Sequence, residues 1–393
     1  MEKIEFLDLG QQPITNNFLS NEAPQNEFLY NLRVGYDQAT SLVSLMEFIP
    51  PIKMFNENYA HRASQSQTMR KAYKELSDNL KKKFKPKSIL EIGSNDGVFL
   101  ENFNNIINVG VEPCKNLAKI TNKIGIKTYS EFWNYNLSNK IINEIGLFDI
   151  VYSANTVSHI HDLEDALYSI SNILNKNGIF ILEDPSLLET LKKVSYDQFY
   201  DEHAYVFSIY SLNKIIKDID LEIFYVEKLN THGGSNRVYF KKKFGNQKVS
   251  NNIDRMISEE KELGINKFET YLDFSKKVQN SKKNLKNLFN IIKDKNKKII
   301  GYGATYKSST VLNYCKIDKN YIEYFIDTTP NKQGKFTPGT HIPIIDPKDG
   351  MNETVDFAFL GAWNFRKEIM NKEIKFIDRG GKFITHVPNP RIL

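Results

Sequence analysis

The segment LEIGSNDGVFL, residues 90–100, decides the fold of this chain. An apolar run that starts at residue 88 leads into a turn with two glycines, and GVFLENF continues as a predicted helix. Glycine in such a turn adopts positive φ without strain and lets the backbone approach a ligand closely. A strand, a glycine turn and a helix in this order predict a parallel α/β sheet with a ligand at its carboxyl edge.

The spacing in the turn indicates which ligand to expect. A dinucleotide fingerprint needs G-x-G-x-x-G, whereas this turn reads E-x-G-x-x-x-G from Glu91 through Gly93 to Gly97. Asn95 and Asp96 complete it. Acidic groups at both flanks repel a phosphate and suit the sulfonium and amino groups of S-adenosylmethionine, so we predict that these five residues bind this cofactor.

Two later strand ends support the same cofactor. The predicted strand NVGVEP (108–113) contains Glu112 at its end, and a carboxylate there can accept both hydroxyls of a ribose. Asn155 follows the predicted strand FDIVYSANT (148–156) and lies at the same edge of the sheet. An ordinary strand turn with capping residues is the alternative interpretation of the glycine motif taken alone.

Strands alternate with helices through most of the chain, which predicts a doubly wound sheet. We expect four regions: a short irregular N-terminal domain (1–70), a Rossmann-like cofactor domain (71–245), a charged helical linker (246–296) and a smaller Rossmann-like C-terminal domain (297–393). The runs EIFYVEKL (222–229) and NRVYFKKK (236–243) predict an antiparallel hairpin that closes the first sheet.

Composition excludes several classes of protein. The 393 residues carry a net charge of +6 spread over many segments, which does not indicate nucleic acid binding. Two cysteines exclude a disulfide framework and a multi-cysteine zinc site. The N-terminus lacks the pattern of a signal peptide, and no apolar run is long enough to span a membrane. We therefore expect a cytoplasmic protein.

A second motif, FYDEHAYVFS (199–208), gathers groups that can move protons. A methyl acceptor needs a base within hydrogen-bond reach, and the pKa of histidine suits that work near neutrality. His203 is the candidate base, with Tyr200 and Glu202 in support. The alternative is that the segment only caps the following helix at Ser208.

Three further residues are considered as possible ligands of a metal ion or an anion. His159 and His161 (SHIHD) are spaced like metal ligands, but no third ligand accompanies them, so we interpret them as polar loop residues. Arg237, in THGGSNRVYF (231–240), is a candidate contact for a phosphate or carboxylate.

These motifs, followed by GYGATYKSSTVLNYC (301–315) and YFIDTTPNKQGKFTPGTHIPI (324–344), resemble the sugar C-methyltransferase family over nearly the whole chain. Members methylate nucleotide-linked 4-keto deoxysugars. The resemblance implies that His203 removes a proton from the carbon next to the ketone and that the enolate carbon accepts the methyl group. It also implies that the C-terminal domain holds the nucleotide, with Gly303, Thr305 and Lys307 at the diphosphate.

One departure from the family concerns its N-terminal zinc site, which four cysteines usually form. The first 113 residues of this chain contain no cysteine, so we predict that zinc is absent. This region lines the sugar site in the family, which makes Tyr59 and His61 candidate substrate contacts.

Three alternatives remain open from the sequence. IIGYGATYK partly mimics a dinucleotide site, as in a NAD-dependent nucleotide-sugar oxidoreductase, but Tyr306 replaces its third glycine. A non-catalytic nucleotide-sugar binding protein and an O-methyltransferase with the same base are the others. We expect no nucleic acid or membrane partner, and a monomer or small homo-oligomer.

Overall fold

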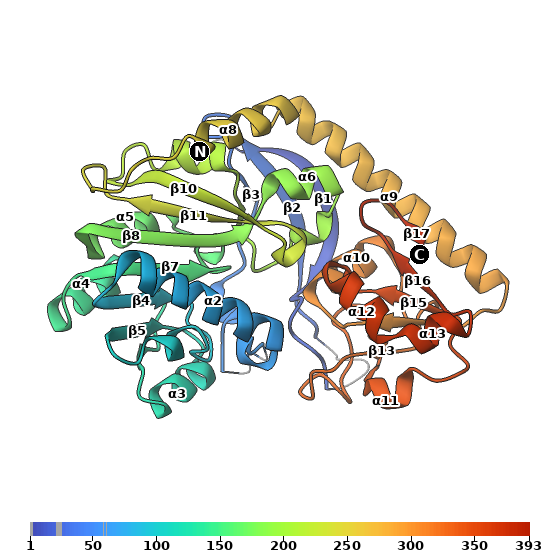
Figure 1. Ribbon diagram of the computed structural model, residues 1–393. Helices are drawn as coiled ribbons and strands as arrows, with labels where there is room; N and C mark the ends of the chain where they lie inside the picture. Colours follow the sequence, from blue (N-terminus) through green and yellow to red (C-terminus); the bar gives the residue numbers. More distant parts are fainter. Residues whose placement is uncertain (1–2, 21–25, 58, 60) are drawn as a thin grey trace.

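The computed structural model describes residues 3–20, 26–57, 59 and 61–393. The strands of these residues form three sheets of four, seven and six strands. Figure 1 shows the seven-stranded sheet in one lobe and the six-stranded sheet in the other, with the N-terminal strands between them. None of the described helices has the length and apolar character that a membrane span needs.

The seven-stranded sheet has the order β10-β11-β8-β7-β4-β5-β6. Strands β4 to β8 are parallel, whereas β11 runs antiparallel to both of its neighbours, β8 and β10. The predicted hairpin at the sheet edge is therefore confirmed. The strands are β4 (Ser88–Ile92), β5 (Ile107–Val111), β6 (Lys127–Tyr129), β7 (Phe148–Ala154), β8 (Leu174–Pro185), β10 (Glu222–Leu229) and β11 (Ser235–Lys241).

Helices cover both faces of this sheet, which is why β4 is buried along its whole length. Ser66 caps the helix that begins at Gln67, since its side chain accepts a hydrogen bond from the amide of Met69. The α-helix predicted directly after the glycine turn is wrong: only a 3-10 turn, Leu100–Phe103, forms there. The helices are α2 (Gln67–Phe84), α3 (Lys115–Lys123), α4 (Tyr135–Glu144), α5 (Leu163–Ile173), α6 (Leu187–Lys193) and α7 (Ile209–Ile215).

The N-terminal region is more regular than the sequence suggested. Instead of an irregular unit, β1 (Lys3–Pro13), β2 (Leu29–Asp37) and β3 (Val43–Leu45) form an antiparallel sheet. The burial pattern along β1 and β2 shows that one face of the sheet packs against the core. Short pieces follow at α1 (Pro51–Met54) and η1 (Ala63–Gln65).

A fourth strand joins this sheet from far along the chain. Strand β9 (Tyr205–Val206) belongs to the histidine motif and pairs antiparallel with β3. Just before it, Asp201 is buried and accepts hydrogen bonds from the amide (3.1 Å) and hydroxyl (2.6 Å) of Thr15. The histidine motif is thus built into the N-terminal sheet.

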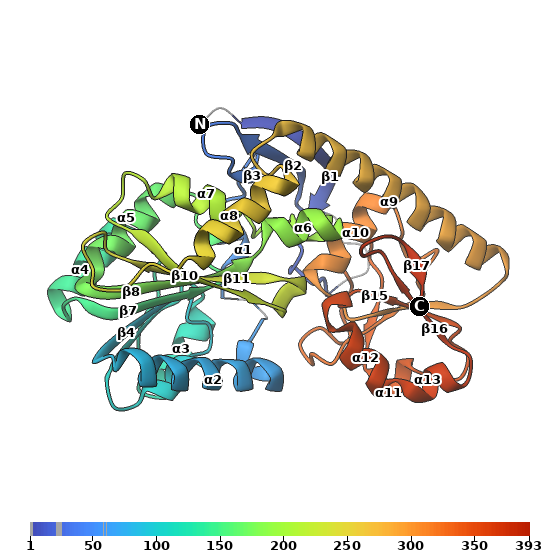
Figure 2. The same cartoon turned by 45° about the horizontal axis from the view of Figure 1, so that its top comes forward.

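Two helices, α8 (Asn252–Leu263) and α9 (Phe268–Asp294), connect the lobes. Figure 2 shows α9 running past the N-terminal strands and along the C-terminal lobe. Its buried face carries Tyr271, whose ring lies 5.0 Å from that of Phe6, and Phe274, whose ring lies 6.2 Å from that of Phe199. The linker therefore shares one apolar core with the N-terminal sheet and the histidine motif.

The C-terminal sheet has the order β14-β13-β12-β15-β16-β17 and is parallel except for β17. Helix α10 (Tyr306–Cys315) follows β12 after a glycine turn, as predicted for a second Rossmann-like unit. The remaining elements are β12 (Ile299–Tyr302), β13 (Phe325–Ile326), β14 (Ile344–Ile345), α11 (Pro347–Gly350), β15 (Phe357–Leu360), α12 (Arg366–Lys372), α13 (Ile374–Asp378), β16 (Lys382–Thr385) and β17 (Arg391–Ile392).

The Asp201–Thr15 contact gives a first prediction. Replacing Asp201 by alanine leaves the buried amide and hydroxyl of Thr15 without their acceptor, which costs about 1–3 kcal/mol of unfolding free energy. Urea unfolding measures this loss. The matched control is Asp218→Ala at an exposed position, which we expect to stay within about 0.5 kcal/mol of the wild type. Equal stability of the two variants would contradict the prediction.

Candidate active site

The glycine turn after β4 is shaped by a close neighbour. Gly93 has φ +77°, and a Cβ placed on it would lie 2.0 Å from the hydroxyl oxygen of Thr156. Only glycine fits there, because a side chain would be strained and would also collide with the loop after β7. The turn and this loop therefore meet at the carboxyl edge of the sheet, where ligands bind in such folds.

Glu112 braces the turn from the next strand. Its carboxylate accepts hydrogen bonds from the amides of Asn95 (2.9 Å) and Cys114 (2.8 Å), one on each oxygen. Each carboxylate oxygen has a second lone pair, so Glu112 can still accept both hydroxyls of a ribose. Its place and orientation fit the predicted role in holding S-adenosylmethionine.

Glu91 lies beneath the turn and is the strongest sign of a cationic ligand. Its side chain is buried, and Oε2 finds no hydrogen-bond partner among the described residues. Burial, with the charges of Glu112 and Asp96, raises the pKa of Glu91 well above its usual value. Ser94 also carries a buried hydroxyl for which the described part of the chain offers no partner. These groups fit the amino and sulfonium charges of the cofactor.

Other predicted cofactor residues brace the turn. Asp96 accepts hydrogen bonds from the amide (3.2 Å) and hydroxyl (2.5 Å) of Ser64, and the Asn95 side chain accepts one from the amide of Ala63 (2.9 Å). Gly97 has φ +83°, and a Cβ there would lie 2.7 Å from the side chain of Thr121 in α3. These contacts join the turn to η1 and α3.

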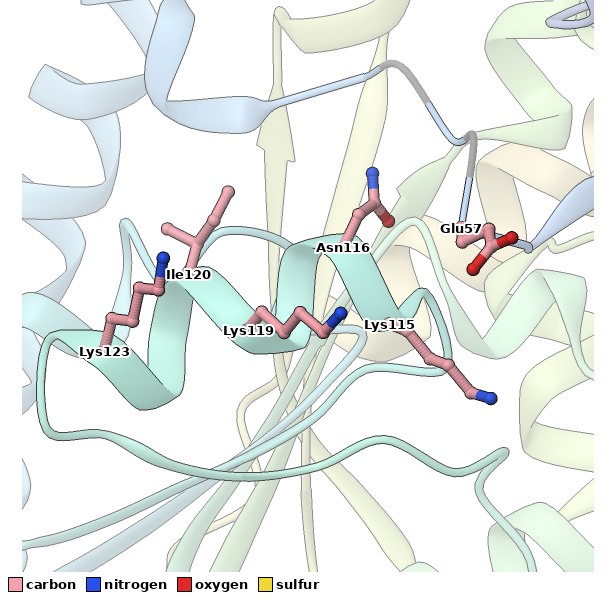
Figure 3. A pocket seen from close by; sticks show the side chains of 6 residues that line it. All are labelled: Glu57, Lys115, Asn116, Lys119, Ile120 and Lys123. Carbon is pink, nitrogen blue, oxygen red and sulfur yellow. The ribbon is translucent and has the colours of Figure 1, made fainter.

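Two cavities border the cofactor edge. One, of about 390 Å³, lies over α3, and Figure 3 shows the lysines of this helix around it. The other, of about 450 Å³, is bounded by Tyr59 and Arg62, by Asn116 of α3 and by the C-terminal segment 330–335. Both have Glu57 and Asn116 in their walls. The second cavity thus lies between the segment after α1, helix α3 and the C-terminal lobe.

The histidine motif holds His203 in one tautomer. Its Nδ1 lies 2.7 Å from the backbone carbonyl of Gln198 and its Nε2 lies 2.9 Å from the hydroxyl of Tyr200. A carbonyl only accepts, so Nδ1 carries the proton and the lone pair of Nε2 accepts from Tyr200. Burial, with the nearby His159, lowers the pKa of His203 well below its usual value. The imidazole is therefore neutral, with a basic nitrogen at Nε2.

Glu202 lies beside this pair in a buried position. Its carboxyl accepts from Asn16 (2.6 Å) and from the hydroxyl of Tyr59 (3.3 Å). Burial and the adjacent Asp201 raise the pKa of Glu202. The structure thus brings Tyr59 to Glu202, whereas His61 is exposed and contributes its backbone carbonyl to Asn95.

The structure brings His159, interpreted from the sequence as a polar loop residue, next to the predicted base. Its ring centroid lies 5.3 Å from that of His203 and 5.6 Å from Phe55, and Nε2 is buried without a partner among the residues described. Its position after β7, at the same edge as Asn155, is the signal that places it here. His161 does behave as a loop residue, with its carbonyl bound by Tyr205 (2.7 Å).

The three predicted phosphate contacts, Gly303, Thr305 and Lys307, either pack against other parts of the protein or are buried. The Thr305 side chain caps α10 and donates to the carbonyl of Gly361 (2.9 Å), and Gly303 packs against Ala362. Lys307 is only 2% exposed, and its ammonium has no hydrogen-bond partner in the described residues. Burial lowers the pKa of Lys307 to about 8 although Asp197 opposes this effect.

Arg237 lies apart from these groups within the sheet. It forms ion pairs with Glu183 (2.9 Å) and Glu227 (2.9 Å). Two carboxylates already neutralise its charge, which gives Arg237 a structural role in joining β11 to β8 and β10.

Comparisons with known proteins extend over the whole chain. Family models match residues 1–55 ("Putative zinc binding domain"), 59–226 ("Methyltransferase domain") and 230–388 ("C-methyltransferase C-terminal domain"). The C-methyltransferase NovU of Streptomyces niveus is 30% identical over 99% of this chain and 94% of its own length.

Solved structures match the chain in part. A methyltransferase of Thermotoga maritima, described as a possible histamine N-methyltransferase, is 22% identical and covers 44% of this chain and 89% of its own, with a TM-score of 0.35. Magnesium protoporphyrin IX methyltransferase of Synechocystis, with bound S-adenosylmethionine, is 10% identical and covers 44% of this chain and 79% of its own, with a TM-score of 0.33.

The glycine turn, the carboxylate on the next strand and the matched methyltransferase domain define an S-adenosylmethionine-dependent methyltransferase. Within this class, the chain belongs to the C-methyltransferase family that includes NovU. The assignment favours a methyltransferase over the oxidoreductase and binding-protein interpretations.

The titration of His203 gives a second prediction. Because its pKa is lowered, protonation requires a more acidic solution than for free histidine, so the ring stays neutral as pH falls through 6.5. Nitrogen-15 spectra of histidine-labelled protein, assigned with a His203→Gln variant, measure this. A His203 signal that titrates at or above pH 6.5 would contradict the lowered pKa of His203.

The zinc prediction can also be tested directly. Residues 1–55 match the zinc-binding family model but contain no cysteine, and no group of three or more His, Cys, Asp or Glu in the described chain is arranged to hold a metal ion. We expect only substoichiometric zinc by elemental analysis of purified protein, and no loss of stability on treatment with a chelator. One zinc ion per chain would contradict the prediction.

Proposed function

We propose that this enzyme methylates the carbon next to the ketone of a nucleotide-linked 4-keto deoxysugar. The observation that carries this proposal is the buried, neutral His203, whose ring lies beside His159 of the cofactor domain and whose Nε2 contacts Tyr200, a residue stacked on Tyr306 of the C-terminal lobe. A ketone acidifies the adjacent C–H, and such a proton needs a positioned base. S-adenosylmethionine, when bound, supplies the electrophilic methyl group.

In this proposal, His203 takes the proton at Nε2 while the Gln198 carbonyl keeps Nδ1–H in place. The charge on the resulting imidazolium is opposite to that of the enolate formed beside it. This attraction offsets the burial that lowers the pKa of His203 in the free protein. The same burial keeps the base unprotonated and ready at neutral pH.

The neighbouring groups suit the sugar. Tyr200 supports the base through its hydroxyl. Glu202, whose raised pKa favours the protonated carboxyl, and Tyr59 offer both donors and acceptors to sugar hydroxyls. Glu91, Gly93, Glu112 and Asn155 line the cofactor edge, and Asn95, Asp96 and Gly97 keep the turn in shape.

We further propose that the nucleotide occupies the 450 Å³ cavity beside the C-terminal lobe. Arg62 and Lys335 border it, and such cations suit a diphosphate. This placement replaces the expected contact with Lys307, whose ammonium is buried. Gly303 and Thr305 do not line this cavity, and in this proposal they shape the turn that begins α10.

Carbon is favoured over oxygen as the methyl acceptor. The relative NovU is described as a C-methyltransferase, and the model that matches residues 230–388 carries the same description. O-methylation with the same base remains the second candidate, since a base beside a hydroxyl could serve it equally.

The test uses S-adenosylmethionine with a carbon-13 methyl group and dTDP-, UDP- and GDP-linked 4-keto-6-deoxyhexoses. We expect one of these to give a product whose methyl group is bonded to carbon by NMR. His203→Gln should lower turnover by about 10²–10⁴-fold, the range for loss of a general base, while S-adenosylhomocysteine binding stays unchanged by calorimetry. A methyl group on oxygen, or full turnover by His203→Gln, would contradict the proposal.

A further inference from the structure

His232 occupies a strained backbone position. It lies in η5 (Thr231–Gly233), the turn between β10 and β11, with φ +53°. A residue other than glycine in the left-handed region is uncommon, and such positions cluster at functional sites. The surroundings of its ring must account for this conformation.

Both ring nitrogens of His232 contact other segments. Nε2 lies 3.4 Å from Nδ2 of Asn155, in the loop after β7, and Nδ1 lies 3.3 Å from the hydroxyl of Tyr306, at the start of α10. An amide nitrogen only donates, so Nε2 accepts from Asn155. In the neutral ring the proton is then on Nδ1, which donates to the oxygen of Tyr306. The Tyr306 hydroxyl proton is not used by His232, so it can be donated to the neighbouring Tyr200 or to a bound acceptor.

Tyr306 stacks on Tyr200, with ring centroids 4.4 Å apart and planes 20° from parallel. The two phenols have opposite hydrogen-bonding roles. Tyr200 donates a hydrogen bond to Nε2 of His203, whereas Tyr306 accepts a hydrogen bond from Nδ1 of His232 and still has its own O–H to donate. One tyrosine–histidine pair is thus arranged to take a proton and the other to donate a hydrogen bond.

Gln198 connects the two tyrosine–histidine pairs through hydrogen bonds. The side-chain amide of Gln198 donates to the backbone carbonyl of His232 (2.6 Å), and the backbone carbonyl of the same Gln198 accepts from His203 (2.7 Å). Gln198 is itself buried. The turn that carries His232 and the segment that carries the base are therefore fixed relative to each other.

We infer that the Tyr306 hydroxyl donates a hydrogen bond to the carbonyl oxygen of the acceptor, and that His232 is its positioning residue. The inference rests on the proposed function, because it requires a ketone beside the reacting carbon. An enolate oxygen needs a donor aimed at it before the charge develops. Tyr200 directs its hydroxyl at His203 and must turn away when Nε2 takes the proton, whereas the half-buried Tyr306 is in place as a donor beforehand.

The step balances in atoms and electrons. The Tyr200 hydrogen bond to Nε2 of His203 opens, the acceptor C–H bond breaks and its proton goes to the freed lone pair of Nε2, and the electron pair moves into the enolate, whose oxygen accepts from Tyr306. The enolate carbon then forms a C–C bond to the methyl group as the C–S bond breaks, which releases S-adenosylhomocysteine. The proton on His203 passes to solvent. No oxidant or reductant is required.

Tyr306→Phe keeps the stacked ring and removes only the hydroxyl. With the acceptor identified from the panel of 4-keto-6-deoxyhexoses, we expect kcat to fall about 10²–10³-fold, as when one oxyanion donor is removed. KM and S-adenosylhomocysteine affinity should stay within a few fold. The matched control is Tyr321→Phe, a half-buried tyrosine of the same lobe that binds Asn290 (3.0 Å), which should retain wild-type kcat.

His232 is tested through its partner. His232→Gly keeps the left-handed backbone but removes the imidazole, so kcat should fall; His232→Asn, which tolerates this conformation and can still donate near Tyr306, should recover part of it. Adding Tyr306→Phe to His232→Gly should cost little more, because both changes remove one interaction.

The outcomes separate this inference from the function on which it rests. Wild-type kcat in Tyr306→Phe, alongside C-methylated product, overturns the role of Tyr306 and leaves the proposed function standing. Fully additive losses in the double variant, or a His232→Gly loss confined to cofactor affinity, overturn the positioning role of His232. If the wild-type enzyme methylates none of the 4-keto acceptors, the proposed function fails and the role of Tyr306 fails with it.

Discussion

The hydrogen bond from Nδ1 of His203 to the carbonyl of Gln198 is the constraint on which the site depends. It fixes the tautomer of a buried imidazole and leaves Nε2 as the basic nitrogen. Without it, the ring could present a proton instead of a lone pair to the acceptor. The Gln198 side chain also donates a hydrogen bond to the backbone carbonyl of His232. Gln198 therefore positions both tyrosine–histidine pairs.

The N-terminal sheet is what holds this segment in place. Strand β9 pairs with β3, Asp201 accepts two hydrogen bonds from Thr15, and Phe199 packs between Phe6 and Phe274. A region whose family model describes zinc binding therefore contributes here through strand pairing and apolar packing. This explains how residues far apart in the sequence form one site without cysteine ligands in the small domain.

Local patterns predicted much of this fold. Apolar runs that end in turns predicted β4, β5 and β7, whereas the short parallel strands β6 and β14 were not predicted. The E-x-G-x-x-x-G spacing with Glu112 indicates the cofactor edge, which stays a prediction. Local patterns do not show which distant segments of the chain pair with each other. The β3–β9 contact, the approach of His159 to His203 and the two partners of His232 all depend on how the three regions pack. The sequence likewise did not indicate that Lys307 is buried, because a lysine after a glycine turn is also typical of a phosphate ligand.

The central claim is that a C–H bond next to the ketone breaks before the methyl group is transferred. An acceptor deuterated at both carbons that flank its ketone tests this most directly, with the product analysed by mass spectrometry. The account predicts that each methylated product has lost one deuterium and that the methyl group stands at the carbon that lost it. A methylated product that retains all of its deuterium would contradict the account.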